Sequence, residues 1–213
     1  GNGTIDESSE TDPRPAERHE AYMYGKAKQD EMVLEYGARF GLPHVIVRPG
    51  DVFGPGRSKI SGKIGIDTFG VFLKIGGRNQ VPLTYVDNCA EAIVLAGLRE
   101  GIEGEVFNVV DDDLPTGNEF LKQYKRKVGG LKSISMPYFA FYFLCLLWEQ
   151  YSALSGGQLP PVFNRRRCIA HWKKAGYSNR KIKEKLGWKP KVPMQAALEI
   201  YFDYLRSARR GHA

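Results

Sequence analysis

Tyr24 and Lys28 lie four residues apart in the segment YGKAK, which begins at Tyr24. On a helix, residues at this spacing project from the same face, one above the other. A free tyrosine has a pKa of about 10, so it is a poor proton shuttle at neutral pH. A neighbouring lysine ammonium favours the phenolate and brings a tyrosine pKa toward neutrality. The spacing therefore predicts an acid–base pair, and it also fits two unrelated solvated side chains.

A second segment, RPGDVFGPG at residues 48–56, follows about twenty residues later and carries the glycine and proline content of a ligand-site floor. It comes after HVIVR, a short β-branched run bounded by prolines, which is typical of a buried parallel strand. Residues 50–80 contain eight glycines. We expect this stretch to form a substrate loop around a short helix near Asp67–Leu73.

Strands and helices alternate along the first 130 residues. The expected elements are a loop over 1–16, a helix over 17–40, strands over 44–48, 81–86 and 106–110, a helix over 88–98 and a helix over 117–128. Asp87 is placed as the N-cap of the second helix, and Thr116 with Glu119 as a capping box for the third. This alternation indicates an α/β fold with parallel strands. The last 80-odd residues look helical.

Met136–Trp148 is thirteen residues long and has no charged side chain. A bilayer span needs about 20 apolar residues, so the segment is too short to be one. A helix that is apolar all round is either buried or docked on something apolar. We expect a helix buried in the core; the alternatives are a wall of a lipophilic substrate site and a contact with a membrane surface, helped by the arginines at 165–167.

The composition is that of an ordinary globular protein, with 42% hydrophobic and 26% charged residues. Three separated cysteines and four scattered histidines give no disulfide framework and no metal-ligand spacing, so we expect a reducing, cytoplasmic location and no metal. The net charge of +7 is uneven, because residues 165–213 hold 14 Lys/Arg and 3 Asp/Glu. A basic end of this kind indicates either an anionic partner or a solvated helical face.

Several motifs together resemble the extended short-chain dehydrogenase/reductase family, which includes the NAD-dependent epimerases and dehydratases. They are YGKAKQDEMVLEYGARFGLPHVIVRPGDVFGPG, VPLTYVDNCAEAIVLA, GEVFNVVDDD and SNRKIKEKLGWKPKVPMQAAL, which occur in the family's order over nearly the whole chain. The resemblance implies the C-terminal part of a Rossmann-type doubly wound parallel sheet over residues 1–130. It implies a mostly helical, substrate-covering subdomain over residues 131–213.

The resemblance also implies roles for named residues, with NAD or NADP as cofactor. Tyr24 would be the general acid–base, and Lys28 would hydrogen-bond the nicotinamide ribose. Pro49, Gly50 and Val52 would border the nicotinamide. A second pair, Tyr22 and Lys26, has the same spacing but faces elsewhere on a helix, and the family pattern Y-G-x-x-K favours Tyr24 with Lys28.

The substrate-binding residues implied by the resemblance are Asp51 and Arg78. Asp51 falls where sugar-nucleotide epimerases often have an asparagine, and an ionised aspartate cannot donate a hydrogen bond. The position of those enzymes' diphosphate-binding arginine is Val81 here, three residues after Arg78. We therefore expect a nucleotide sugar as substrate, with a lipophilic alcohol, as in the 3β-hydroxysteroid-dehydrogenase-like branch, as the alternative.

No glycine-rich G-x-G-x-x-G unit follows a strand in this sequence. We therefore expect a C-terminal portion of a larger protein, whose upstream half would supply that unit and the family's catalytic serine or threonine. The partners we expect are a small-molecule substrate, a second copy of the chain and at most a weak membrane-surface contact. No nucleic-acid partner is expected, although a non-catalytic binding protein that uses its basic end is a third reading.

Overall fold

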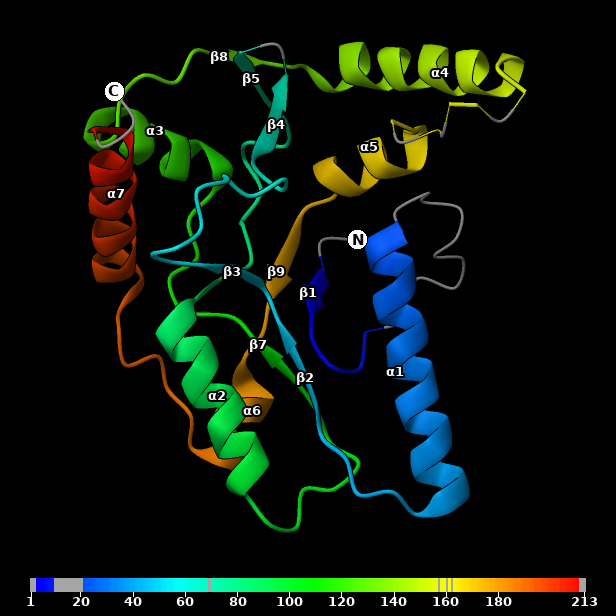
Figure 1. Cartoon of the computed structure of the whole chain (residues 1–213), viewed down its shortest axis with the longest axis vertical. Coiled ribbons are helices and arrows are strands. Elements are labelled where there is room, and N and C mark those ends of the chain that lie inside the picture. The colour runs from blue at the N-terminus through cyan, green and yellow to red at the C-terminus, as the bar shows by residue number, and fades with distance from the viewer. Residues whose placement is uncertain are drawn as a thin grey trace.

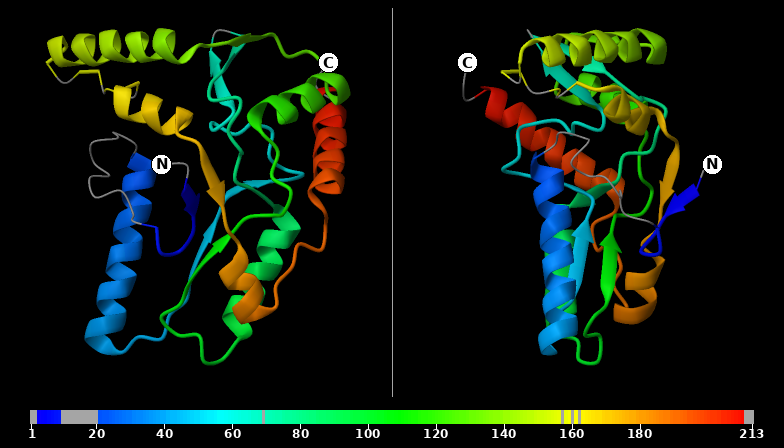
Figure 2. Two further views of the ribbon diagram at one scale, coloured as in Figure 1. Left: turned by 180° about the vertical axis from the view of Figure 1, so that it is seen from behind. Right: turned by 90° about the vertical axis from the view of Figure 1, so that its right-hand side faces the viewer.

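Short parallel strands run through the middle of the molecule, and helices lie on both sides of them (Figure 1). The computed structural model describes residues 3–9, 21–68, 70–156, 158–159, 161 and 163–210. The helices α1 (Ala21–Phe40) and α2 (Val86–Leu98) lie on one side of the strands, and α6 (Arg180–Leu186) lies on the other (Figure 2). The expected α/β class is confirmed.

Two pairs of parallel strands meet at Gly50. Strand β2 (Ile46–Pro49) pairs with β7 (Val106–Val109), and β3 (Asp51–Phe53) pairs with β6 (Leu83–Tyr85). The Gly50 N–H donates to the Val109 carbonyl at 2.8 Å, whereas the Asp51 N–H donates to the Pro82 carbonyl at 2.6 Å. The chain therefore changes neighbours at Gly50, and a Cβ there would lie 2.3 Å from the Pro82 oxygen. Only glycine fits this crossing.

The predicted loop over 1–16 is wrong at its start. Strand β1 (Gly3–Ile5) runs parallel to β9 (Ala175–Tyr177), with Gly3 opposite Ala175. The partner strand comes from the far end of the chain, so no local pattern announces this pairing. Residues 10–16 of that loop and 17–20 of the predicted helix lie outside the described residues, and from residue 21 the predicted helix is confirmed as α1.

The predicted short helix near Asp67–Leu73 is also wrong. This segment forms an antiparallel hairpin of β4 (Gly65–Thr68) and β5 (Val71–Lys74), and β8 (Ser133–Ser135) adds a parallel third strand. Gly70, in the turn, has a φ of +74°, which glycine adopts without strain. The backbone of β5 is satisfied by β8, since the Phe72 N–H donates to the Lys132 carbonyl at 2.8 Å. This long-range pairing outweighs local helix propensity.

Of the two helix starts predicted from capping residues, one is wrong and one is confirmed. Helix α2 begins at Val86, and Tyr85 is its N-cap, without a side-chain capping bond. Asp87 is therefore not the cap, although its charge in the first turn suits the helix dipole. Helix α3 (Gly117–Lys127) has the predicted capping box, with Thr116 and Glu119 each bonded to the other's backbone N–H.

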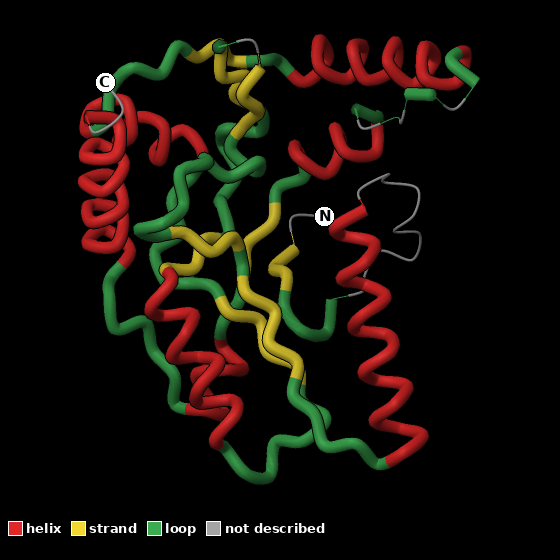
Figure 3. The backbone as a smooth tube through the Cα atoms, in the orientation of Figure 1, coloured by secondary structure: helices red, strands yellow, loops and turns green. Residues whose placement is uncertain are grey.

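The C-terminal part is mostly helical, as predicted, with α4 (Tyr138–Leu154), α5 (Arg165–Trp172), α6 and α7 (Met194–Arg210). Strand β8 precedes α4, and β9 lies between α5 and α6. Figure 3 shows long loops between these elements and the central strands. Helix α7 packs into the largest core cluster with β3, β6 and α3. A second cluster joins α2, β7 and α6. The division of domains at residue 130 stays a prediction.

The expectation that Met136–Trp148 is buried in the core is wrong. Phe141 and Cys145 of α4 are buried, but Phe139 is 74% exposed and Phe143 is 56% exposed. The helix lies along one edge of the molecule and contacts α5 on one side only (Figure 1). Being apolar all round did not bury this helix, because the described part of the chain covers only one of its faces.

Candidate functional site

The predicted acid–base pair lies on α1, with both side chains accessible. Tyr24 is 41% exposed, and the Lys28 Nζ lies 2.5 Å from the Glu31 Oε2. The hydrogen bond and charge of Glu31 raise the pKa of Lys28, and Tyr24 shifts it in the same direction by a smaller amount. Lys28 is therefore a cation at neutral pH with an electrostatic interaction with Tyr24. Its ammonium is shared with a carboxylate that the sequence analysis did not consider.

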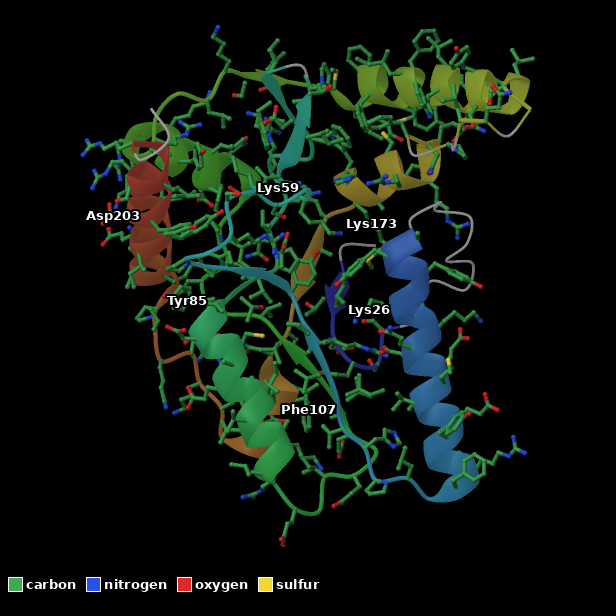
Figure 4. All side chains as sticks on the ribbon, in the orientation of Figure 1. Lys26, Lys59, Tyr85, Phe107, Lys173 and Asp203 are labelled. Carbon is green, nitrogen blue, oxygen red and sulfur yellow. The ribbon has the colours of Figure 1, made fainter. Side chains whose placement is uncertain are left out.

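The competing pair in the other register has a different environment. Tyr22 is 73% exposed, and the Lys26 Nζ donates to the Gln29 Oε1 at 3.0 Å (Figure 4). Both pairs stand on the same helix at the same spacing. Tyr22 and Lys26 are therefore a matched control for any test of Tyr24 and Lys28.

An ion pair joins α1 to the central strands. Arg48 lies in β2, and its Nε and Nη2 atoms both lie 2.8 Å from the Oδ2 of Asp30. Helix α1 has no buried residue, so this pair is a principal tie between the helix and β2 in the part of the chain that the structure describes. Asp30 comes two residues after Lys28, and Arg48 directly precedes Pro49. The pair therefore fixes Asp30, two residues after Lys28, beside β2 one residue before Pro49.

The end of β2 lies near the surface, where Pro49 is exposed and Gly50 is half-buried. Pro49 ends the strand, Gly50 carries no side chain, and Val52 continues into β3. The Thr84 hydroxyl accepts from the Gly50 N–H at 3.2 Å and donates to the Val109 carbonyl at 2.7 Å. Ligands of open α/β sheets bind beyond the carboxyl ends of parallel strands. The predicted cofactor-bordering residues thus lie at an edge of the kind such ligands use.

Asp51 is engaged by its own loop. Its Oδ1 lies 2.9 Å from the Arg57 Nη2, and its Oδ2 accepts from the Ser61 hydroxyl. Arg57 also donates to the Val52 carbonyl. This arrangement satisfies the carboxylate inside the protein and folds the glycine-rich loop back onto β3. A direct contact of Asp51 with substrate would have to replace one of these partners.

A small pocket of about 10 Å³, with room for roughly one water molecule, lies beside this cluster. It is lined by Asp51, Phe53, Arg57, Lys59, Ser61, Leu83, Phe120 and Tyr201. The lining combines apolar and aromatic side chains on its walls with two cations, Arg57 and Lys59 (Lys59 is labelled in Figure 4). Ligand sites commonly combine an apolar lining with a few placed polar groups in a volume of about 300–1,000 Å³, so a substrate would have to widen this pocket.

Arg78 is not among the residues lining this pocket. It is exposed in a turn in which the Asn79 N–H donates to the Gly76 carbonyl at 2.9 Å. Asn79 also donates from its side chain to the His171 carbonyl at 2.6 Å, which ties the turn to α5. The sequence analysis missed Arg57, Ser61 and Tyr201. Opposite charges six residues apart in a glycine-rich loop were the available signal for Arg57; Tyr201 lies too far along the chain for any local signal.

A buried network of hydrogen bonds lies at the start of α2, next to strand β6. Asp111 accepts from the Tyr85 N–H at 2.9 Å and from the Asn88 amide at 3.1 Å, and burial raises the pKa of Asp111 to about 6. The Asn88 side-chain amide exchanges two hydrogen bonds with the Val192 backbone. The backbone carbonyl of Asn88 accepts a hydrogen bond from the Trp188 indole. The network fixes the start of α2 (Tyr85 is labelled in Figure 4) and the segment leading into α7.

Comparison with known proteins identifies the family to which this chain belongs. A family profile described as "NAD dependent epimerase/dehydratase family" matches residues 1–109. The chain is 26% identical over 215 residues to 3beta-hydroxysteroid-dehydrogenase/decarboxylase isoform 1 of Arabidopsis thaliana, which covers 94% of the chain and 49% of the relative. It is 23% identical over 223 residues to a decarboxylating sterol-4-alpha-carboxylate 3-dehydrogenase of Candida albicans, covering 93% of the chain and 60% of the relative.

Among solved structures, UDP-glucuronic acid 4-epimerase from Bacillus cereus, in complex with UDP-glucuronic acid and NAD, superimposes with a TM-score of 0.67. The identity is 19%, and the match covers 98% of this chain and 58% of that one. This likeness supports the Rossmann-type fold. The chain spans about half the length of the first curated relative it matches. In the part of the chain that the structure describes, no helix is long and apolar enough to span a bilayer.

Proposed function

We propose an oxidoreductase function, because this chain belongs to the NAD-dependent epimerase/dehydratase family. In this proposal the full-length protein oxidises or reduces a secondary hydroxyl or carbonyl group with NAD or NADP. The observation that carries the proposal is the placement of Tyr24 and Lys28. They stand together on α1, and the Arg48–Asp30 ion pair ties that helix to the strand that ends at Pro49. The proposal concerns the whole protein, since the chain spans only part of its relatives' length.

The residues at the end of β2 suit a dinucleotide's nicotinamide end. Pro49 is exposed and Gly50 is half-buried at this end, and Lys28 supplies a cation for a ribose hydroxyl. We assign Tyr24, Lys28, Pro49, Gly50 and Val52 to this contact. The nicotinamide, when bound, accepts or donates a hydride.

The chain's own part in the reaction is the movement of a proton. The Tyr24 oxygen takes the proton from a substrate hydroxyl during oxidation and returns it to the carbonyl oxygen during reduction. Lys28 stabilises the phenolate in between, because a positive charge nearby favours the anion. Glu31 holds the Lys28 ammonium from the other side and keeps it protonated.

For the substrate we favour a lipophilic secondary alcohol. The small pocket beside Asp51 is lined by Phe53, Leu83, Phe120 and Tyr201 of the main core, and it would have to widen to admit such a molecule. The printed names of both curated relatives state steroid or sterol substrates. Asp51 would border the substrate indirectly, since Arg57 and Ser61 hold its carboxylate. Arg78 remains a proposed contact, now the weaker one.

A nucleotide sugar is the second candidate. Arg57 and Lys59 line the same pocket, and a guanidinium binds a diphosphate through paired hydrogen bonds. Arg57 would then have to leave Asp51, so this reading requires a rearrangement of the loop. The two candidates therefore differ in whether the Asp51–Arg57 pair survives substrate binding.

The test uses the full-length protein with NAD and with NADP, in turn with a 3β-hydroxysterol and with UDP-glucuronic acid. Absorbance at 340 nm reports reduced cofactor, and mass spectrometry identifies oxidised or epimerised product. Tyr24→Phe should lower kcat by roughly 10²–10⁴-fold, which is the usual contribution of a general acid–base. Lys28→Met should act in the same direction.

The matched controls are Tyr22→Phe and Lys26→Met, which make the same changes one half-turn away on the same helix. Both should keep activity near that of the wild type. Full activity of Tyr24→Phe, or loss of activity in Tyr22→Phe alone, would refute the assignment. If no cofactor binds to the full-length protein, the non-catalytic reading replaces the enzymatic one.

Two further expectations accompany this function. We propose a homodimer that pairs through α1, because Met32, Tyr36 and Phe40 are exposed on this helix; light scattering of the full-length protein tests it. We also propose a cytoplasmic location, in keeping with three buried, unpaired cysteines.

A further inference from the structure

Helix α4 carries an exposed apolar face that the described part of the protein leaves uncovered. We define the α4 face by six of its exposed large apolar side chains, which are Phe139, Phe143, Leu144, Leu147, Tyr151 and Leu154; Tyr138 is also exposed, but its ring packs against Trp172. Four of them follow at intervals of four residues, so they form one line along the helix. Phe139 is 74% exposed and Leu154 is 86% exposed. This is a continuous surface rather than isolated apolar residues of the kind any protein shows.

The opposite side of α4 holds the helix firmly. Phe141 and Cys145 are buried together with Cys168 of α5 and Ile75. Glu149, at the edge of the contact, accepts from the Arg165 Nε at 2.7 Å and from the Arg165 backbone N–H at 2.7 Å. The α4 face therefore projects outward because the inner side is fixed. Figure 2 shows the helix at the periphery in both views.

Positive charge lies on and just after α5, the helix that packs against the inner side of α4. Residues 150–179 contain no Asp or Glu and five Lys/Arg, which are Arg165, Arg166, Arg167, Lys173 and Lys174. Several of these lie on or just after α5, which packs directly against α4 (Lys173 is labelled in Figure 4). Packed helices lie about 8–10 Å apart, close to the distance of about 8 Å over which salt screens a charge. A partner that covers α4 would thus feel this charge.

We propose that the α4 face binds the surface of an anionic lipid bilayer, with α4 lying along the interface. The large side chains of the face offer carbon surface, and Tyr151 alone among the six carries a polar group. Such a face suits lipid better than a protein partner, which would require a polar rim with hydrogen bonds. Tyr138, Trp148 and Tyr151 add the aromatic rings typical of membrane interfaces. The charge of residues 165–174 matches anionic headgroups.

The length of the helix agrees with this orientation. Its 17 residues extend about 25 Å at a rise of 1.5 Å per residue, and the hydrocarbon core of a bilayer is about 30 Å thick. A helix that is fixed along one side to the protein lies on a membrane rather than across it. Membrane binding through α4 does not require the catalytic role of Tyr24 and Lys28.

The experiment is sedimentation of the full-length protein with vesicles of phosphatidylcholine alone and of phosphatidylcholine with phosphatidylserine. Binding should be stronger to the anionic vesicles and should fall as salt is raised. The triple variant Phe139→Gln/Phe143→Gln/Leu147→Gln should bind at least about ten-fold more weakly, since three apolar side chains no longer enter the interface. All three positions are exposed, so the fold should survive, and circular dichroism checks this.

The matched control is Ile93→Gln/Val94→Gln/Leu98→Gln, which changes three exposed apolar residues on α2. It should bind vesicles like the wild type. Equal binding of both triple variants would overturn the proposal, because charge alone would then explain the association. A concentration-dependent dimer that the α4 variant abolishes, without vesicle binding by the wild type, would also overturn it and make a second copy the occupant.

Discussion

Helices α4 and α7 have the same length, 17 residues each, and opposite relationships to the core. Helix α7 buries Met194, Ala197, Leu198, Tyr201, Phe202 and Leu205 on one stripe and has charged residues on the other side. Helix α4 is more apolar overall, yet only three of its residues are buried. Apolar content alone therefore does not determine burial. The spacing of apolar residues, with a partner surface to receive them, does.

The largest expected effect tests this difference directly. Phe202 is fully buried in α7 and contacts the Phe120 and Tyr124 rings, with centroids 5.3 and 5.9 Å away. Phe202→Ala should lower the free energy of unfolding by about 3–5 kcal/mol, because it leaves a cavity in the main core. Phe143→Ala in α4 should change it by about 0.5 kcal/mol or less, as at other exposed positions.

Urea denaturation of both variants measures the contrast. Equal losses would show that α4 is covered in solution, for example by another part of the full-length protein. The wild type at several concentrations is the control, since a dimer that covers α4 would make its midpoint depend on concentration.

The two regions should also respond to pH in opposite senses. Asp111, in the network that holds the α7 lead-in, has its pKa raised to about 6, chiefly by burial. Its native form binds a proton more tightly than the unfolded chain does, so its contribution to stability declines as pH rises from about 4 to 6. His171, at the end of α5, has its pKa lowered to about 4 by burial and by the charges of Lys63 and Arg167. Its contribution is lost as pH falls from about 6.5 to 4. Each amounts to about 3 kcal/mol.

Because these windows overlap with opposite signs, the wild type should show little net change in stability from these two groups between pH 4 and 6.5. Asp111→Asn keeps an acceptor for Asn88 but cannot ionise, so it should expose the His171 dependence and leave a stability that rises with pH. His171→Gln should expose the reverse slope. Urea midpoints at half-unit pH steps measure both, and parallel profiles for the two variants would contradict the assignment.

A third prediction concerns the hydrogen bonds that anchor the segment before α7. Asn88 bonds the backbone N–H and carbonyl of Val192 at 3.0 and 2.9 Å, two residues before α7 begins. Asn88→Ala would leave these groups and Asp111 short of partners, and unsatisfied buried groups cost about 1–3 kcal/mol each. We expect about 2–3 kcal/mol of destabilisation after water has replaced some bonds, together with faster proteolysis near residue 192. Cleavage near residue 155 instead would place the weak point at α4.

The comparison of α4 with α7 also shows which features of the fold could be predicted from the sequence. Local signals worked, as in the Thr116–Glu119 capping box, the β7 strand and the stop of α1 before Pro43. The positions of Tyr24 and Lys28 on one helix also followed from spacing. Each of these depends on residues within one turn or strand of each other, so a short window contains the whole cause.

The rest depends on partners far along the chain. Strand β1 pairs with β9, which lies about 170 residues away, and β5 is satisfied by β8 rather than forming a helix. Tyr201 reaches the pocket at Asp51 from α7. The exposure of α4 could not be predicted either, because its apolar residues are compatible with burial until the covering elements are known.

The smallest predicted effect concerns the polar tie of α4, which corresponds to Asn88 in the other region. Glu149 binds Arg165 through both carboxylate oxygens, but the Arg165 side chain is 46% exposed. Water can solvate either group once the pair is broken, so Glu149→Gln should cost less than about 1 kcal/mol. Double-variant cycles with Arg165→Gln isolate the coupling. A coupling energy as large as the loss of unfolding free energy from Asn88→Ala would mean that α4 is held as tightly as α7. The outward orientation of the α4 face would then result from this ion pair rather than from the lack of a covering element.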